Sequence, residues 1–120
     1  MTKLTFFSDS GFFWGFRETG HTGFGEEGDD VLCAALSAMT MLLLNTLEVA
    51  VGVHVDYTID DKEAEITLKC PSARKDHDCD EKKHFAAEAV IRGYFLQIQD
   101  LCEEYYDYLE VDVKDDADVV

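Results

Sequence analysis

The chain has 120 residues, 26 of them acidic and 10 basic, which gives a formal net charge of −16 at pH 7. Its 47% hydrophobic and 12% aromatic residues are typical of a globular protein, and its length predicts a single domain over residues 1–120. The negative charge argues against direct binding to nucleic acid, because phosphates would be repelled. It favours a basic protein partner, or it serves only to keep the chain soluble.

The sequence contains no uninterrupted run of about 18 apolar residues, so we expect no transmembrane helix and no membrane partner. The first nine residues lack a signal-peptide cleavage site, which favours a cytoplasmic location. The cysteines do not have the spacing of a disulfide scaffold, and we expect reduced thiols. They are Cys33, Cys70, Cys79 and Cys102.

The chain opens with a predicted hairpin. Residues 2–7 are aromatic and β-prone, residues 8–11 are a turn cluster, and residues 12–19 form the second strand. This hairpin places His21 directly after its second strand.

A long helix is predicted from Asp30 to about Leu47, since apolar residues recur at steps of three and four. Apolar residues also occupy much of its opposite side, so we expect more than one side to be covered. The covering element is either a second helix of the same chain or a partner subunit.

In residues 49–59 a large apolar side chain alternates with a small or polar residue, which predicts a strand. The turn at residues 60–62 leads to a second strand over residues 63–70. His54 falls on the polar face of the first of these strands and is expected to be solvated. Residues 71–81 form a polar loop.

Two thiols and two imidazoles lie in or beside this loop, namely Cys70, His77, Cys79 and His84. Their spacing follows no standard zinc pattern, so we expect no metal site and no cofactor.

A second long helix is predicted from Lys82 to about Tyr108, with Gly93 marking a close crossing with the first helix. Residues 109–113 predict a short edge strand before an acidic tail. The order β-β-α-β-β-α, with a possible final β, predicts an α+β fold, a two-layer sandwich with both helices on one face of a mixed or antiparallel sheet.

Residues 20–38 combine the parts that a thiol nucleophile needs. His21 precedes a loop with Gly23, Gly25 and Gly28, whose conformational freedom would let the loop bring the imidazole beside Cys33. Asp29 or Asp30 is the expected N-cap of the helix, which would put Cys33 in the first turn, where the helix dipole favours thiolate. The alternative is that Cys33 is a small core residue and His21 a polar residue at a strand end.

Ser37 lies one helical turn after Cys33, on the same face, where a core helix needs no hydroxyl.

This stretch resembles the ribosomal-processing cysteine proteases, the Prp or YsxB-like family. The resemblance rests on the pair Gly20-His21 and on residues 28–38, Gly-Asp-Asp-Val-Leu-Cys-Ala-Ala-Leu-Ser-Ala. His21 and Cys33 match the catalytic dyad of that family in identity and spacing. Asp30 matches the acidic position before the cysteine, and Ser37 the serine one turn after it. Thr22 departs from the usual alanine and Leu32 from the usual valine, and neither change touches a reactive group.

The resemblance implies a homodimer and a cysteine endopeptidase that removes the N-terminal extension of a basic ribosomal protein, the twenty-seventh of the large subunit, after paired phenylalanines. Cys33 would be the nucleophile and His21 the general acid and base, with the oxyanion stabilised by helix amides near Cys33 and Ala34. Asp30 would orient His21 or only cap the helix, and Ser37 would support the site by a hydrogen bond to the dyad or to the substrate. Gly20, Gly23, Gly25 and Gly28 would contact the substrate. The loop from Thr22 to Gly28 would close over a bound peptide, or serve only as a long connection between strand and helix.

Two other functions remain open. A non-catalytic, chaperone-like dimer would hold the same basic ribosomal protein without needing Cys33. A thiol redox sensor is the third reading, although no resolving cysteine lies near Cys33 in the sequence.

Overall fold

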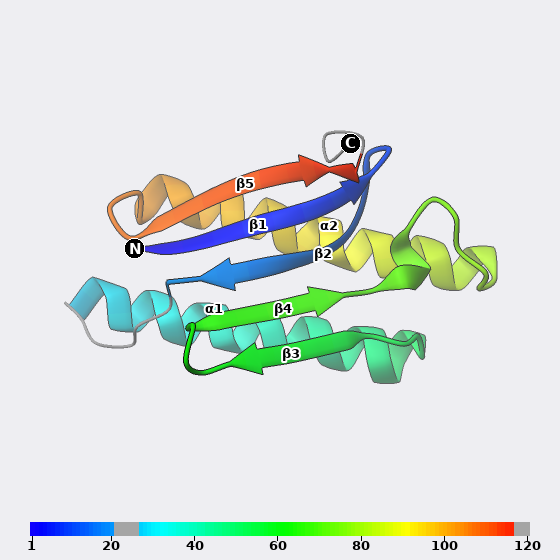
Figure 1. The fold of residues 1–120 in the computed structure, drawn as a ribbon, viewed down its shortest axis with the longest axis horizontal. Coiled ribbons are helices and arrows are strands. Elements are labelled where there is room, and N and C mark those ends of the chain that lie inside the picture. The colour runs from blue at the N-terminus through cyan, green and yellow to red at the C-terminus, as the bar shows by residue number, and fades with distance from the viewer. Residues whose placement is uncertain (21–26, 117–120) are drawn as a thin grey trace.

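The structure is a computed structural model that describes the backbone of residues 1–20 and 27–116 and the side chains of residues 1–20 and 31–116. A five-stranded sheet, in the order β3-β4-β2-β1-β5, forms one layer. The helices α1 and α2 lie side by side behind it and form the second layer (Figure 1). The predicted α+β sandwich with both helices on one face is therefore confirmed.

The predicted opening hairpin is present. Strand β1 (Thr2–Asp9) pairs antiparallel with β2 (Phe12–Thr19). Ser10 and Gly11 make the turn with φ of 53° and 88°, and a two-residue turn with two positive φ angles matches the twist of the strands. Strand β1 runs two residues beyond the predicted end, because the turn needs only these two residues.

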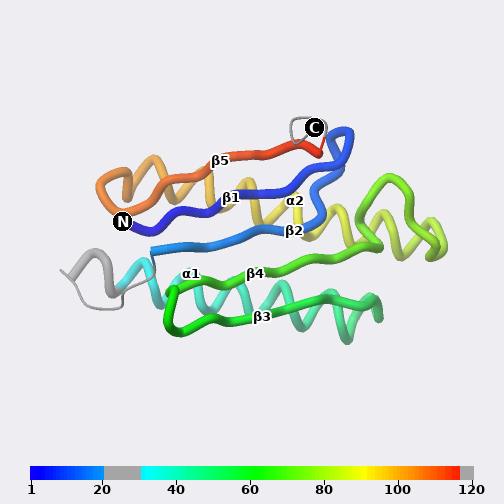
Figure 2. The backbone as a smooth tube through the Cα atoms, viewed as in Figure 1, coloured from blue at the N-terminus to red at the C-terminus, as the bar shows by residue number. Residues whose placement is uncertain are grey.

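The last strand, β5 (Leu109–Asp115), pairs parallel with β1, and Figure 2 shows the two running in the same direction. Strand β4 (Glu65–Lys69) pairs antiparallel with β2, and β3 (Asp56–Asp60) pairs antiparallel with β4. The sheet is thus mixed, and the predicted final edge strand exists and is longer than expected.

The first helix, α1 (Glu27–Asn45), continues into a π-helical turn, η1 (Thr46–Val51). The strand predicted over residues 49–59 is therefore wrong in its first half. Gly52, with φ of +81°, ends the helix, and its amide and that of Val53 both donate to the carbonyl of the fully buried Leu47. Burial of Leu47 keeps the chain helical past the point where the alternation begins.

The hairpin of β3 and β4 is shorter than predicted. The Asp60 carboxylate accepts hydrogen bonds from the amides of Lys62 and Glu63, at 3.1 and 3.2 Å, and so closes the turn. Ala64 has a φ of +51°, which extends the turn and delays β4 to Glu65. His54 is exposed, as predicted, and its Nε2 lies 2.8 Å from Asp56.

A short 3₁₀ turn, η2 (Pro71–Ala73), follows β4, and α2 runs over Glu81–Glu104. The predicted end of α2 near Tyr108 is wrong. The carbonyl of Tyr105 accepts hydrogen bonds from the amides of Tyr108 and Leu109, and this turn lets Thr2 N donate to Tyr108 O at 2.8 Å. Pairing of β5 with β1 therefore ends the helix four residues early.

The core lies between the sheet and the helices, and Phe6 is at its centre. The Phe6 ring, which is fully buried, packs edge-on against Phe95 with centroids 5.0 Å apart and also contacts Phe16 and Tyr94. Phe16 and Tyr94 stack at 5.0 Å with nearly parallel planes. These contacts join β1 and β2 to α2, and they account for the predicted apolar stripe of that helix.

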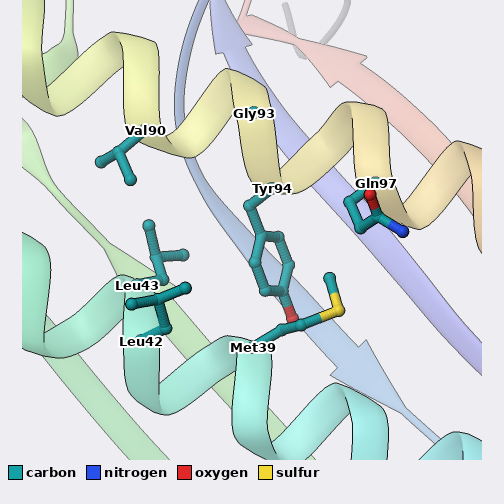
Figure 3. A pocket seen from close by; sticks show the side chains of 7 residues that line it. All are labelled: Met39, Leu42, Leu43, Val90, Gly93, Tyr94 and Gln97. Carbon is teal, nitrogen blue, oxygen red and sulfur yellow. The ribbon is translucent and has the colours of Figure 1, made fainter.

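Gly93 does not mark a close crossing, because a Cβ added there would meet nothing within 4 Å. The helices leave between them a groove of about 250 Å³ (Figure 3). Its lining residues are Met39, Leu42, Leu43, Val90, Gly93, Tyr94 and Gln97. The sequence prediction of a tight helix contact at Gly93 is therefore wrong.

One segment, Val31–Val51, is long and apolar enough to cross a membrane, with a mean hydropathy of 1.6, although the sequence has no uninterrupted apolar run. Length and composition are weak evidence, because the core helix of a globular protein passes the same test. The segment supplies Leu32, Leu36, Leu43 and Leu47 to the core.

Candidate functional site

Cys33 is buried and is the seventh residue of α1, because that helix begins at Glu27. Asp29 and Asp30 accordingly lie inside the helix, and the prediction that one of them is its N-cap is wrong. The effect of the helix dipole is concentrated in the first turn, and Cys33 lies beyond that turn. The sequence placed the helix start too late, since Glu27 and Gly28 carry no apolar signal.

The predicted oxyanion site at the amides of Cys33 and Ala34 is also corrected. Only the first four amides of an α-helix lack a partner within it, whereas Cys33 and Ala34 are the seventh and eighth residues of α1. The amides of Cys33 and Ala34 point to carbonyls of the preceding turn. They are therefore not available to a tetrahedral intermediate.

Ser37 is exposed on α1, one turn after Cys33, and it lines a cavity of about 260 Å³ between this helix and the sheet. We call this the Glu18 cavity. Its lining residues are Glu18, Leu36, Ser37, Thr40, Met41, Tyr57, Ile59 and Ile66. Positions 33, 36, 37 and 40 share one helical face. The hydroxyl that the sequence singled out thus belongs to a cavity that begins one turn from the thiol.

Glu18 is the residue that sequence reasoning missed. It is 2% exposed although it is an acid, and it lies on the same side of β2 as the fully buried Phe16. The sequence did contain a signal for this burial, because Glu18 lies two residues after Phe16 and therefore on the same face of the predicted strand.

The Glu18 carboxylate affects the phenols around it. The pKa of Tyr57 is raised, first by burial and then by the negative charge of Glu18. The pKa of Tyr94 is raised mainly by burial, with Glu18 again contributing, although the hydrogen bond to Thr40 acts in the opposite direction. Tyr94 Oη and Thr40 Oγ1 are 2.8 Å apart in the core. Both phenols therefore stay protonated. The Glu18 carboxylate, the two phenols and the hydroxyls of Thr40 and Ser37 lie beside or on α1.

Gly20 follows β2 with a φ of +76°, and a Cβ at this position would lie 2.2 Å from the carbonyl oxygen of Met1. No other residue fits without a shift of the backbone. The structure thus gives Gly20 a local reason to be glycine, independent of any contact with substrate.

The other predicted site residues fall outside or at the margin of what the structure describes. His21, Gly23 and Gly25 lie outside the described residues, so their predicted roles stay predictions. Gly28 and Asp30 are described only as backbone of α1. Gly28, which was predicted as part of the glycine loop, therefore belongs to α1.

His77 and Cys79 of the loop and His84 of α2 form a separate cluster beside η2. The rings of His77 and His84 stack with centroids 3.9 Å apart, and Cys79 Sγ lies 3.5 Å from His77 Nδ1. His84 Nδ1 is 2.9 Å from the carbonyl of Ser72, so this nitrogen is already engaged. Among the side chains that the structure describes, those of residues 1–20 and 31–116, no group of three or more His, Cys, Asp or Glu is placed to hold a metal ion. None of the four cysteines, all in described segments, forms a disulfide.

Comparison with known proteins gives the fold and the family. Residues 1–110 match the family described as cysteine protease Prp. No curated protein matches the sequence significantly. The chain is similar to SMU.848 of Streptococcus mutans, with 27% identity, a TM-score of 0.79, and coverage of 96% of this chain and 98% of that one.

Two structures of the essential ribosomal processing protease Prp from S. aureus are also similar. One is in complex with a substrate peptide, with 19% identity and a TM-score of 0.77. The other holds a covalently linked product peptide, with 21% identity and a TM-score of 0.75. In both cases the match covers 95% of this chain and 100% of the other. At these identities the likeness shows a common fold. Because the family match spans more than nine-tenths of the sequence, the chain belongs to the cysteine protease Prp family and is a cysteine protease.

Proposed function

We propose that the chain removes the short N-terminal extension of a large-subunit ribosomal protein, the twenty-seventh in its series, by cutting after paired phenylalanines. The observation that carries the proposal is the family match over residues 1–110. The S. aureus protease of the same fold, a ribosomal processing enzyme, binds a substrate peptide. The charge of −16 favours a very basic substrate.

In the proposed mechanism, His21 takes the proton of the Cys33 thiol, and the thiolate attacks the carbonyl carbon of the scissile bond. The imidazolium then protonates the leaving amine as the C–N bond breaks, which leaves a thioester on Cys33. Water, deprotonated by His21, attacks the thioester and releases the acid product and the thiol. Ser37, one turn from Cys33, would hydrogen-bond the bound peptide, and Asp30 would orient His21.

We propose that Gly20, Gly23, Gly25 and Gly28 give the segment around His21 the freedom to close over the peptide. The same proposal includes a single domain and no cofactor. It also includes a cytoplasmic site of action, with no membrane or nucleic acid partner.

A homodimer is also proposed. Support comes from the groove between α1 and α2, which is lined mainly by apolar side chains, and from Leu42, which is 67% exposed beside it (Figure 3). Sedimentation of the wild type and of Leu42→Glu tests this. A dimer that Leu42→Glu dissociates is expected, and a wild-type monomer at micromolar concentration would contradict it.

The test of function is cleavage of a peptide that carries the paired-phenylalanine junction, by wild type, Cys33→Ala and His21→Ala. Cleavage by wild type alone is expected, with rates reduced by at least about a thousandfold in both variants, as when one member of a catalytic unit is removed. Cys102→Ala is the matched control, since Cys102 is a half-buried thiol on α2, and it should cleave normally. If wild type and Cys33→Ala bind the peptide equally and neither cuts it, the chain is a non-catalytic binding dimer and the proposal is wrong.

A further inference from the structure

Both helices lie on one face of the sheet (Figure 1), and a recess of about 260 Å³ lies on the other face. Its lining residues are Phe7, Trp14, Arg17, Lys69, Lys114 and Asp116. We call it the basic recess. It shares no lining residue with the Glu18 cavity, and the inference drawn from it is independent of the proposed protease function.

The position of the recess follows from the strand register. Residues of β1 alternate between buried and half-buried, and half-buried Phe7 points away from the helices that cover buried Phe6. Phe7 is paired with Lys114 of β5 on one side and with Gly15 of β2 on the other. Lys69 of β4 is paired with Gly15 in turn. The two lysines therefore stand at the ends of one row across four strands, with about 14 Å between their Cα atoms.

A β-bulge adds Trp14 to this row. The register of β1 and β2 shifts between Phe7 and Ser8, and Trp14 is the residue inserted there. Its ring packs on Phe7 with centroids 5.5 Å apart. Its indole N–H is buried and has no acceptor among the described residues. The floor of the recess is thus aromatic, and it includes a donor without an acceptor.

The cations of the recess have few negative partners. Among the described residues, no carboxylate forms an ion pair with Lys69 or Lys114. Arg17 pairs with Glu65 at 3.8 Å, and this pair is weak because half of the Arg17 side chain is exposed. The carboxylate of Asp116 is already paired with a neighbouring arginine. In a chain with 26 acidic and 10 basic residues, three cations at one recess therefore match an anionic partner.

The surroundings of the recess favour a short acidic peptide over a nucleic acid. The Arg74 guanidinium lies 4.3 Å from the centroid of the Trp14 ring, where a base would stack. Lys69 Nζ lies over the Phe7 ring in the same way, at 5.8 Å. Exposed Asp112, on the same side of β5 as the lysine of that strand, would repel a phosphate backbone that continued beyond the recess.

We propose that the basic recess is a docking site for a short acidic segment of a second protein. The lysine and arginine side chains bind its carboxylates, and Phe7 and Trp14 contact its aliphatic groups. This partner differs from the basic substrate proposed above. Because the recess and α1 lie on opposite faces of the sheet, a docked segment does not cover α1.

The experiment measures binding of a fluorescein-labelled octapeptide of alternating glutamate and leucine, by fluorescence anisotropy at about 0.15 M sodium chloride. The matched probe has glutamine in place of each glutamate. Wild type is expected to bind the acidic peptide about tenfold more tightly than the amide peptide. The double variant Lys69→Gln and Lys114→Gln should lose this preference. Lys62→Gln with Lys82→Gln, an equal charge change at exposed lysines outside the recess, should keep it.

Cleavage of the paired-phenylalanine peptide is the second measurement. The recess variant, Lys69→Gln with Lys114→Gln, should cleave at the wild-type rate, because its lysines lie on the other face of the sheet from α1. If it is folded by circular dichroism and has lost cleavage, the lysines belong to the active site and the proposal is wrong. A wild type that never cleaves contradicts the protease function alone, since peptide binding is measured without cleavage.

Equal binding of the two peptides by wild type would overturn the proposal, as would an equal loss of preference in both double variants. Three other occupants would each overturn it as well. A labelled oligothymidine that binds more tightly than the acidic peptide, and that the recess variant releases, would assign the recess to nucleic acid. Peptide binding only by a chain that ends at Asp116 would assign it to residues 117–120. A dimer that the recess variant dissociates, seen by sedimentation, would assign it to a second copy.

Discussion

Two different constraints act where β2 ends, one at Glu18 within the strand and one at Gly20 directly after it. Glu18 turns a carboxylate into the layer of the helices, where it is 2% exposed. Gly20 takes a left-handed conformation under the carbonyl of Met1. The end of β2 is thus fixed by a close backbone contact at Gly20 and by a buried carboxylate at Glu18.

Gly20→Ala is expected to lower the free energy of unfolding by about 2–4 kcal/mol, because strain at positive φ adds to a Cβ placed 2.2 Å from Met1 O. Gly11→Ala is the matched control. It has a φ of +88° but nothing within 4 Å, so only the conformational cost of about 1 kcal/mol applies. Urea denaturation of both variants measures the difference. Equal losses would mean that the contact with Met1 relaxes freely.

The thiol of Cys70 links stability to pH. Burial raises its pKa from 9.0 to about 11, against the effect of the nearby amides of Ala73 and Ser72. Because the folded pKa lies above the unfolded one, its contribution is complete below pH 9 and is lost as pH rises toward 11. Cys70→Ala should therefore lose less stability than wild type between these pH values. Urea unfolding at pH 8 and at higher pH measures this, and parallel pH profiles would contradict it.

At the scale of elements, each helix has a stabilising contact that the structure shows. Helix α2 has a side-chain cap, because Asp80 Oδ1 accepts a hydrogen bond from Lys83 N at 2.8 Å. Helix α1 begins at Glu27, and its first described side chain is that of Val31. Packing of Leu32, Leu36 and Leu43 against the sheet is what stabilises it.

Asp80→Ala is expected to cost about 1 kcal/mol of unfolding free energy, because it leaves an amide of the first turn of α2 without its partner. Asp80→Asn keeps the acceptor and should lose much less. The exposed Asp78, two residues earlier in the same loop, provides a control for charge, and Asp78→Ala should stay close to wild type. Thermal denaturation of the three variants measures these differences in stability. If Asp80→Asn is as unstable as Asp80→Ala, the charge of Asp80 and not its hydrogen bond stabilises the helix.

At the scale of the whole molecule, the 26 acidic residues outnumber the 10 basic ones, so the side-chain charges of this small protein repel one another on balance. Such a field opposes compaction and attracts cationic partners. Both effects weaken with salt, because charges are screened beyond about 8 Å at 0.15 M ionic strength.

The melting temperature is therefore expected to rise as sodium chloride increases from a few millimolar to about 0.15 M, where screening becomes strong. The double variant Glu103→Lys and Glu104→Lys reduces the net charge at two exposed positions of α2, and it should show a smaller rise. Differential scanning calorimetry at several salt concentrations tests this. A wild-type melting temperature that falls with salt would mean that attractive ion pairs dominate.

Local patterns in the sequence were enough to predict the hairpin of β1 and β2, the existence of both helices, and the final strand. Each of these rests on short-range signals, which are apolar periodicity and turn residues. The motif around Cys33 likewise predicted the family, since Gly20, His21, Cys33 and Ser37 occur at the spacing of its signature.

Other features depended on contacts between distant residues. Burial of Leu47 extended the helical segment through residues that alternate like a strand, and pairing of Thr2 with the end of the chain cut α2 short at Glu104. The preferences of single residues are too weak to predict either outcome, because the stabilising energy comes from packing and strand pairing.

The sequence by itself determined the class of fold, the family and the candidate nucleophile, because these depend on periodicity and on a motif read along the chain. The tertiary structure alone decided where α1 begins, which removed the expected cap and oxyanion site, and it alone placed Glu18 inside a cavity with Ser37 and Tyr57. Those three residues are far apart in sequence. Only the packing of α1 on the sheet brings a strand carboxylate, a helix hydroxyl and an edge-strand phenol to one place.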